Sequence, residues 1–163
     1  MQKTEQLQIR VSATQKAQIQ ARAKRAGEDV SKWVLRQLLP PVQDRFQNLI
    51  GNLAMGSNSQ SYALAEIHDF LSGLSSEQLH KAVDNPPVVH LSEFSANYLA
   101  AMIEFCCVSK SINLPAWLDD IESLEEPWFA SSLTGLRLYL LTQSPPAFRR
   151  RNLFIDSTIG DRV

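Results

Sequence analysis

A strict alternation of polar and apolar residues runs from Gln6 to Val11, near the start of the chain. A period of two is typical of a β-strand with one buried and one exposed face, so Leu7, Ile9 and Val11 are predicted to point inward. The first forty residues contain no second run of this kind with which the strand could pair. A lone strand of this kind needs a partner from outside its own chain.

Two short helices are predicted to follow this strand. Ser12 or Thr14 can cap the first helix, and Gly27 stands where a glycine commonly ends one. Asp29 is a favourable cap for the second helix, which is predicted over Val30–Leu39. One strand and two helices over about 40 residues bury too little apolar surface to be stable alone.

A second copy of the chain solves both problems. Two strands can pair antiparallel across a two-fold axis, and four helices then cover their apolar face. We therefore predict an obligate homodimer, or a higher even oligomer. Its predicted core consists of Leu7, Ile9, Val11, Ile19, Val34 and Leu38.

The overall charge of −1 hides a strong asymmetry. Residues 1–40 carry eight basic and three acidic side chains, a net charge of +5. The remaining residues carry eight basic and fourteen acidic side chains, a net charge of −6. This pattern indicates a polyanion-binding end joined to a body with a different task, and charge alone leaves nucleic acid and an acidic protein both open.

The N-terminal pattern also resembles a known family. It consists of Gln6, Gln8 and Arg10 on the alternating strand, Ala17, Ile19, Ala23 and Gly27 in and after the first helix, and Asp29-Val30-Ser31-x-Trp33-Val34 at the second. Over residues 5–39 the chain resembles the ribbon-helix-helix DNA-binding modules of the MetJ/Arc class, whose paired strands enter the major groove.

The resemblance implies roles for six residues. Base edges would be read by Gln6, Gln8 and Arg10, and DNA phosphates would be contacted by Val30, Ser31 and Lys32. Glutamine suits adenine and arginine suits guanine, while free N–H groups at a helix N-terminus attract phosphate. Asp29 departs from the favourable pattern, because its carboxylate repels a phosphate at that position.

Three proline pairs divide the rest of the chain, because proline interrupts helices. We predict a DNA-binding and dimerisation module over residues 1–40, an acidic all-helical domain over 41–145, and an extended Arg/Phe-rich tail over 146–163. Apolar residues at helical spacing begin at Phe46, and the most apolar helix, predicted from Glu93 to about Ile112, is the expected centre. The predicted fold class is mainly α.

Nothing in the body indicates catalysis. The three histidines lack metal-ligand spacing, and there is no Gly-rich phosphate loop and no nucleophile elbow. Cys106-Cys107 lies in the most apolar helix, where a thiol is inert. We expect no enzymatic activity, catalytic residue, cofactor or metal. An acidic cluster of Asp119, Asp120, Glu122, Glu125 and Glu126 is interpreted as a solvated loop or a surface for a basic partner.

The sequence also bears on location. No apolar run approaches the roughly 20 residues of a membrane-spanning helix, and the first residues lack the apolar core of a signal peptide. We expect a cytoplasmic protein, nucleoid-associated if bacterial, with no membrane partner.

The tail concentrates arginines and aromatic rings. One hypothesis makes Phe148, Arg149, Arg150, Arg151 and Phe154 a partner-binding element, since Arg and aromatic residues anchor interfaces. In the alternative, the apolar side chains pack on the body and the arginines pair with its acids. A third possibility is a second DNA contact through the three arginines. The tail and Pro127-Trp128-Phe129 are similar to the C-terminal parts of small bacterial proteins encoded beside nucleotidyltransferase-like toxins.

These observations favour one function. The chain is interpreted as a dimeric DNA-binding repressor and antitoxin, which binds its operator in double-stranded DNA, autoregulates its operon and neutralises a cognate toxin, possibly nucleotidyltransferase-like, through its C-terminal region. The alternative is a protein-interaction subunit that does not bind DNA and whose N-terminal module only dimerises.

Overall fold

A computed structural model describes residues 8–56 and 60–156 of the chain. The chain divides into two compact units, one ending at Pro41 and the other beginning at Val42. The boundary falls at the first proline pair, where the sequence predicts a break. Within the described residues, no helix is both long enough and apolar enough to cross a membrane.

The first unit contains two helices, α1 (Ala13–Arg25) and α2 (Val30–Leu38). Ser12 caps α1 in a capping box, in which its hydroxyl accepts from the Gln15 amide and the Gln15 side chain accepts from the Ser12 amide. Gly27 follows α1 with a φ of 67°, a left-handed conformation that glycine adopts without strain. The two predicted helices and their caps are confirmed.

The described part of the predicted strand, residues 8–11, forms no β-strand. Gln6 and Leu7 lie outside the described residues. A strand is defined by hydrogen bonds to a neighbouring strand, and a single chain supplies none at this position. The difference follows from the absence of the second chain that the prediction requires.

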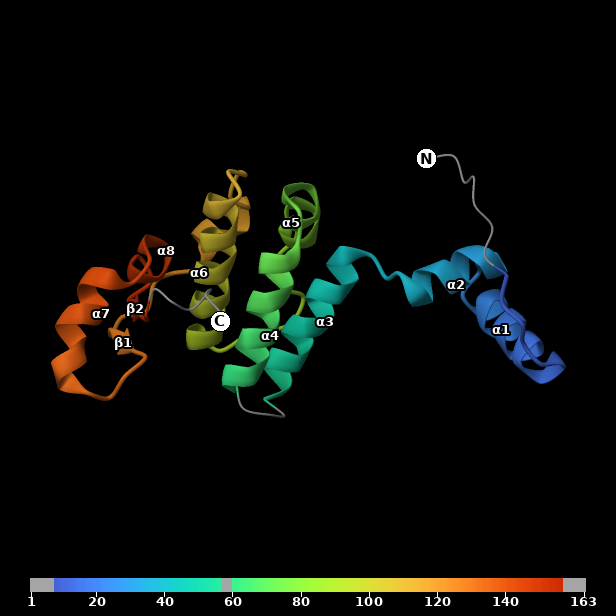
Figure 1. Cartoon of the computed structure of the whole chain (residues 1–163), viewed down its shortest axis with the longest axis horizontal. Coiled ribbons are helices and arrows are strands. Elements are labelled where there is room, and N and C mark those ends of the chain that lie inside the picture. The colour runs from blue at the N-terminus through green and yellow to red at the C-terminus, as the bar shows by residue number, and fades with distance from the viewer. Residues whose placement is uncertain (1–7, 57–59, 157–163) are drawn as a thin grey trace. The chain divides into compact units, whose positions relative to one another are not determined.

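The second unit is built on four helices: α3 (Val42–Met55), α4 (Gln60–Gly73), α5 (Ser76–Val83) and α6 (Glu93–Ser109). Helix α3 packs against α4 and α5, and α6 packs against α4, α5 and α8 (Figure 1). Most of α6 is buried, which makes it the central helix as predicted, although it ends at Ser109, before Ile112. Ser92 caps it by accepting a hydrogen bond from the Ser95 amide.

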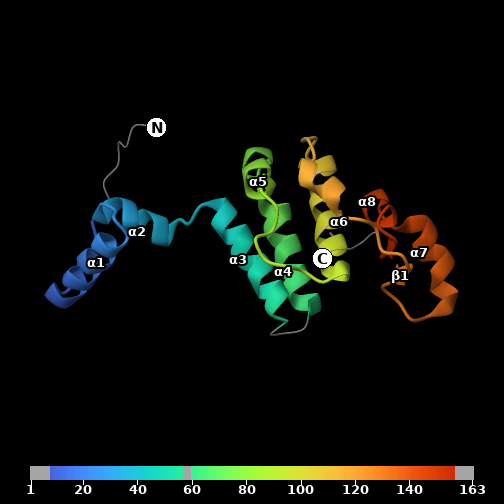
Figure 2. The ribbon, with the colours of Figure 1, turned by 180° about the vertical axis from the view of Figure 1, so that it is seen from behind.

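The C-terminal part of this unit is made of short elements. They are the 3₁₀ helix η1 (Ala116–Asp120), strand β1 (Trp128–Phe129), the 3₁₀ helix η2 (Thr134–Leu136), helices α7 (Arg137–Gln143) and α8 (Pro146–Arg149), and strand β2 (Leu153–Phe154). Strands β1 and β2 form a parallel pair in which Trp128 faces Leu153 (Figure 2). The domain predicted as purely helical therefore contains a small sheet, which is too short to leave a pattern of period two in the sequence.

The residues predicted as an extended tail fold back onto this unit. Helix α8 packs on α6, and β2 pairs with β1. Within the described residues the tail is thus part of the second unit, because its apolar side chains are needed to complete the core of that unit.

Candidate nucleic-acid interface

The predicted base-contact residues lie in the segment that precedes α1. Gln8 and Arg10 are exposed, so their amide and guanidinium groups are free to reach another molecule. Gln6, the third predicted contact, lies outside the described residues. Amide and guanidinium groups can each form two hydrogen bonds to a base edge in the major groove.

The apolar side chains of the first unit are poorly covered. Ala23 is the only buried residue among the described residues of this unit. Ile9 and Leu38 are each 59% exposed, Val11 is also exposed, and Ile19 and Val34 are half-buried. Five of the six residues predicted for the dimer core are therefore described, and none is buried within one chain. Such a contiguous apolar surface on so small a unit indicates an interface.

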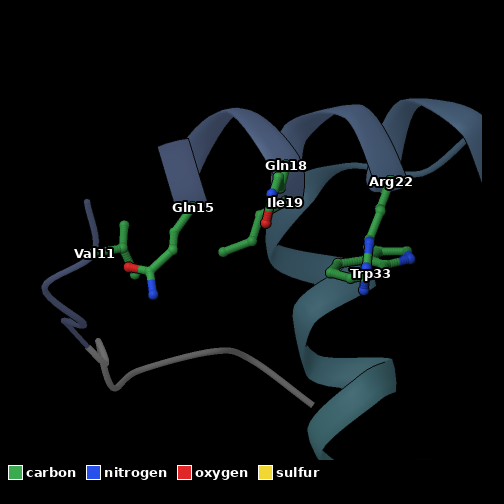
Figure 3. Close-up of a pocket in the computed structure, with 6 residues that line it drawn as sticks. All are labelled: Val11, Gln15, Gln18, Ile19, Arg22 and Trp33. Atoms are coloured by element: carbon green, nitrogen blue, oxygen red, sulfur yellow. The ribbon is translucent and has the colours of Figure 1, made fainter. Parts of the chain in front are cut away.

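A groove lies between the segment before α1 and the two helices. Figure 3 shows Val11 at one end, Ile19 from α1 in the middle and Trp33 from α2 at the other end. Gln15, Gln18 and Arg22 complete its walls. Apolar side chains thus form much of a concave surface that is open in the single chain.

The three polar groove residues were not predicted as site residues. Gln15, Gln18 and Arg22 lie four residues before, one residue before and three residues after Ile19. Residues three or four apart share a helix face, so the position of Ile19 was the signal that identifies Gln15 and Arg22. They were overlooked because polar residues on a helix usually face water.

The N-terminus of α2 is occupied by its own cap. The amides of Ser31 and Lys32 donate to Asp29 Oδ2 at 3.0 and 3.4 Å. A phosphate that binds these amides must displace the Asp29 carboxylate and tolerate its charge. The Ser31 hydroxyl and the Lys32 ammonium group remain exposed, as does Val30, whose side chain offers no polar contact.

An ion pair fixes the turn between the two helices. Arg36 in α2 lies 3.2 Å from the carboxylate of Glu28, which follows α1. Because Glu28 is one of only three acids in this unit, its pairing leaves most of the basic charge of α1 uncompensated, including Lys16, Arg22 and Lys24. The unit keeps a positive field that attracts polyanions.

The tail residues predicted to bind a partner have a different role. Phe148 is completely buried, and Phe154 and Arg151 are also buried within the second unit. The Phe148 ring packs edge-on against Tyr98, with a centroid distance of 5.4 Å. The partner-binding prediction is wrong for these three side chains, because a residue already in the core cannot anchor a partner. The packing alternative describes them correctly.

The three arginines of the tail separate in the same way. Arg151 donates to the carbonyl oxygens of Leu118 and Ile121, and burial lowers the pKa of its guanidinium group. Arg150 forms an ion pair with Glu104, a buried acid of α6. Arg149 is exposed. Only Arg149 is therefore presented to solvent without a described partner.

Comparisons with known proteins match the first unit. No curated protein and no solved structure matches the chain. Residues 1–51 match the NikA-like family, described as mobilization protein NikA, a ribbon-helix-helix-type relaxosome protein. The matched residues include α1, α2 and the first part of α3. The match supports a ribbon-helix-helix-type DNA-binding N-terminus for this chain.

Proposed function

We propose that the protein is a dimer that binds a specific site in double-stranded DNA through its N-terminal unit. The observation that carries this proposal is the uncovered apolar surface of that unit, which is joined to a positive charge of +5. The family match over residues 1–51 supports the same conclusion independently.

Dimerisation accounts for the exposed apolar side chains. A second chain supplies the strand that residues 8–11 lack, and its aliphatic side chains can enter the groove beside Ile19 and Trp33. Burying apolar surface contributes roughly 25 cal/mol per Å², which offsets the cost of association. The single chain leaves this surface in water.

DNA recognition follows from the same pairing. Two antiparallel strands place Gln8 and Arg10 of both chains on the solvent side, opposite the aliphatic core. These side chains then enter the major groove, while Ser31 and Lys32 contact the flanking phosphates. Gln6 extends the reading surface in this proposal.

The similarity to a mobilization protein favours DNA mobilisation as the process in which the complex acts. The second candidate is the operator of the protein's own operon, since the same dimer can block transcription. The comparisons found neither an antitoxin nor a protein linked to a toxin. The buried tail further weakens the case for a toxin-neutralising element formed by Phe148 and Phe154.

A binding experiment tests the proposal. The full-length protein is mixed with labelled duplexes that tile the DNA on both sides of its gene, and binding is measured at 50 and 200 mM salt. Neutralising about six phosphates makes affinity fall by roughly 10³-fold between these concentrations. A protected site upstream of the gene favours the operator, and a protected site elsewhere in the tiled DNA favours mobilisation.

Arg149→Ala is the matched control, because it removes an exposed arginine from the second unit. It should leave DNA binding unchanged. The absence of any binding at 50 mM salt contradicts the proposal and favours the alternative in which the N-terminal unit only dimerises.

A further inference from the structure

An apolar surface on the second unit has no role in its core. It is formed by η2, α7 and the residue before them, and we call it the α7 face; its residues are Leu133, Leu136, Leu138, Tyr139 and Leu141. Leu138 is 74% exposed and Leu133 is 64% exposed, whereas Leu140 is the only buried residue of α7. A helix in a globular protein normally turns its apolar residues toward the core. Clustered exposure of this kind marks an interaction site.

The α7 face is held in place by contacts at both ends of the helix. At the C-terminal end, the Ser144 hydroxyl donates to the Ile155 carbonyl and accepts from the Ile155 amide at 2.6 and 2.8 Å. At the N-terminal end, the Arg137 guanidinium lies 5.1 Å from the centre of the Phe129 ring. These contacts tie α7 to both strands of the sheet, so the surface is formed before any partner arrives. A preformed surface lowers the entropic cost of binding.

An acidic segment belongs to the same substructure. Five carboxylates lie between positions 119 and 126, and all five side chains are exposed: Asp119, Asp120, Glu122, Glu125 and Glu126. None of them forms an ion pair in the described part of the chain. The segment leads directly into β1, and Asn152 beside β2 donates to the Leu124 carbonyl at 2.6 Å. It is therefore anchored to the sheet that also carries α7.

The charge of this region selects among occupants. Residues 116–144 carry these five acids and a single basic residue, Arg137. DNA and anionic membranes are repelled by such a surface. A second copy of the chain bound symmetrically brings the same carboxylates toward each other, because a two-fold contact uses the same patch on both subunits. A basic partner gains attraction from every one of these charges.

We propose that the α7 face and the acidic segment form a docking surface for a basic amphipathic helix of another protein. The partner's apolar side chains cover Leu138 and Leu141, and its lysines or arginines face the carboxylates that end with Glu125 and Glu126. An apolar centre with a charged rim is the usual anatomy of a protein interface. This surface lies in the second unit and does not depend on DNA binding by the first.

Peptide binding to the full-length protein tests this proposal. The probes are three fluorescent 18-residue peptides: a helix with a leucine face and a lysine face, the same helix with glutamates in place of lysines, and a lysine-rich peptide without leucines. Fluorescence anisotropy is measured at 50 and 200 mM salt. We expect the first peptide to bind at least tenfold more tightly than the other two, and its affinity to fall with salt.

Variants locate the binding surface. The double change Leu138→Ser and Leu141→Ser should weaken binding at least tenfold, and Glu125→Gln with Glu126→Gln should weaken it and reduce its salt dependence. Val108→Ser is the matched control, since Val108 is also exposed but lies on α6. Circular dichroism shows whether each variant is folded, and DNA binding should be unchanged in all of them.

Three results would overturn the proposal. The acidic helix can bind as well as the basic one, or the leucine variants can bind like the wild type. Sedimentation of the protein without peptide can also show self-association that the leucine variants abolish, in which case a second copy covers the α7 face. A loss of DNA binding alone would contradict the proposed function and leave this proposal standing.

Discussion

Replacing Phe148 with alanine distinguishes a structural tail from a partner-binding one. The side chain is completely buried between helices, and its ring lies edge-on to Tyr98 and Phe105, at centroid distances of 5.4 and 6.5 Å. Removing a buried phenylalanine ring leaves a cavity and typically costs about 3–5 kcal/mol. Part of this loss is the pairing of the rings, which contributes about 0.5–1.5 kcal/mol for each pair. The total is a large share of the roughly 5–15 kcal/mol that stabilises a domain.

Urea unfolding of the full-length protein measures this effect. Trp117 and Trp128 report on the second unit, while Trp33 reports on the first. With a urea dependence near 2 kcal/mol per molar, the second unit should unfold at about 2 M less urea in Phe148→Ala than in the wild type. The first unit should unfold as before.

Arg149→Ala is the control, since the neighbouring arginine is exposed and its replacement should change stability by less than about 0.5 kcal/mol. A change below about 1 kcal/mol for Phe148→Ala would refute the reasoning. Such a result would return Phe148 to the set of candidate partner contacts, because an interface anchor contributes little to the stability of the free protein.

Four further predictions concern the rest of the chain. Arg10→Ala should relax base preference at one position of the DNA site at a cost of about 1–3 kcal/mol, measured with duplexes that vary one base pair at a time; an equal loss on every sequence would make Arg10 a phosphate contact. Ile9→Asp should abolish the dimer, because it places a charge in the predicted apolar core; a folded and still dimeric variant in sedimentation would disprove the paired-strand architecture. Asp29→Asn should keep the cap of α2 yet strengthen DNA binding at low salt, since it removes a negative charge beside the phosphate position; weaker binding in a titration would show that the carboxylate itself is needed. Burial raises the pKa of Cys107 to about 11, so at pH 8 only roughly one thiol in a thousand is ionised and a thiol reagent should react only after unfolding; rapid labelling of the native protein would contradict this.

Local sequence patterns were sufficient for the helices and the boundary between the units. Ser12 and Asp29 cap α1 and α2, and Gly27 takes the left-handed conformation expected after a helix. These features depend on hydrogen bonds and backbone angles within a few residues of each other. The proline pair at position 40 marks the boundary for the same local reason.

The strand and its function depend on a different kind of information. Alternation from Gln6 to Val11 predicts which side chains are apolar and which are polar, and the structure leaves Ile9 and Val11 exposed as a dimer requires. The hydrogen bonds that make a strand come from a second chain, so a single chain cannot display them. The sequence therefore predicts this element more directly than one copy of the fold can show it.

The C-terminal region required the tertiary structure. Composition alone could not separate a partner-binding tail from a packed one, because arginine and phenylalanine are common in interfaces and both also occur in cores. Only the fold buries Phe148 and Arg151 while it leaves Arg149 and the apolar residues of α7 in solvent. Helical spacing identifies which residues share a face, but the neighbours that cover that face lie far away in the chain. For this reason the sequence determined the elements and the charge asymmetry, and the tertiary structure decided which apolar surface is core and which remains exposed for a partner.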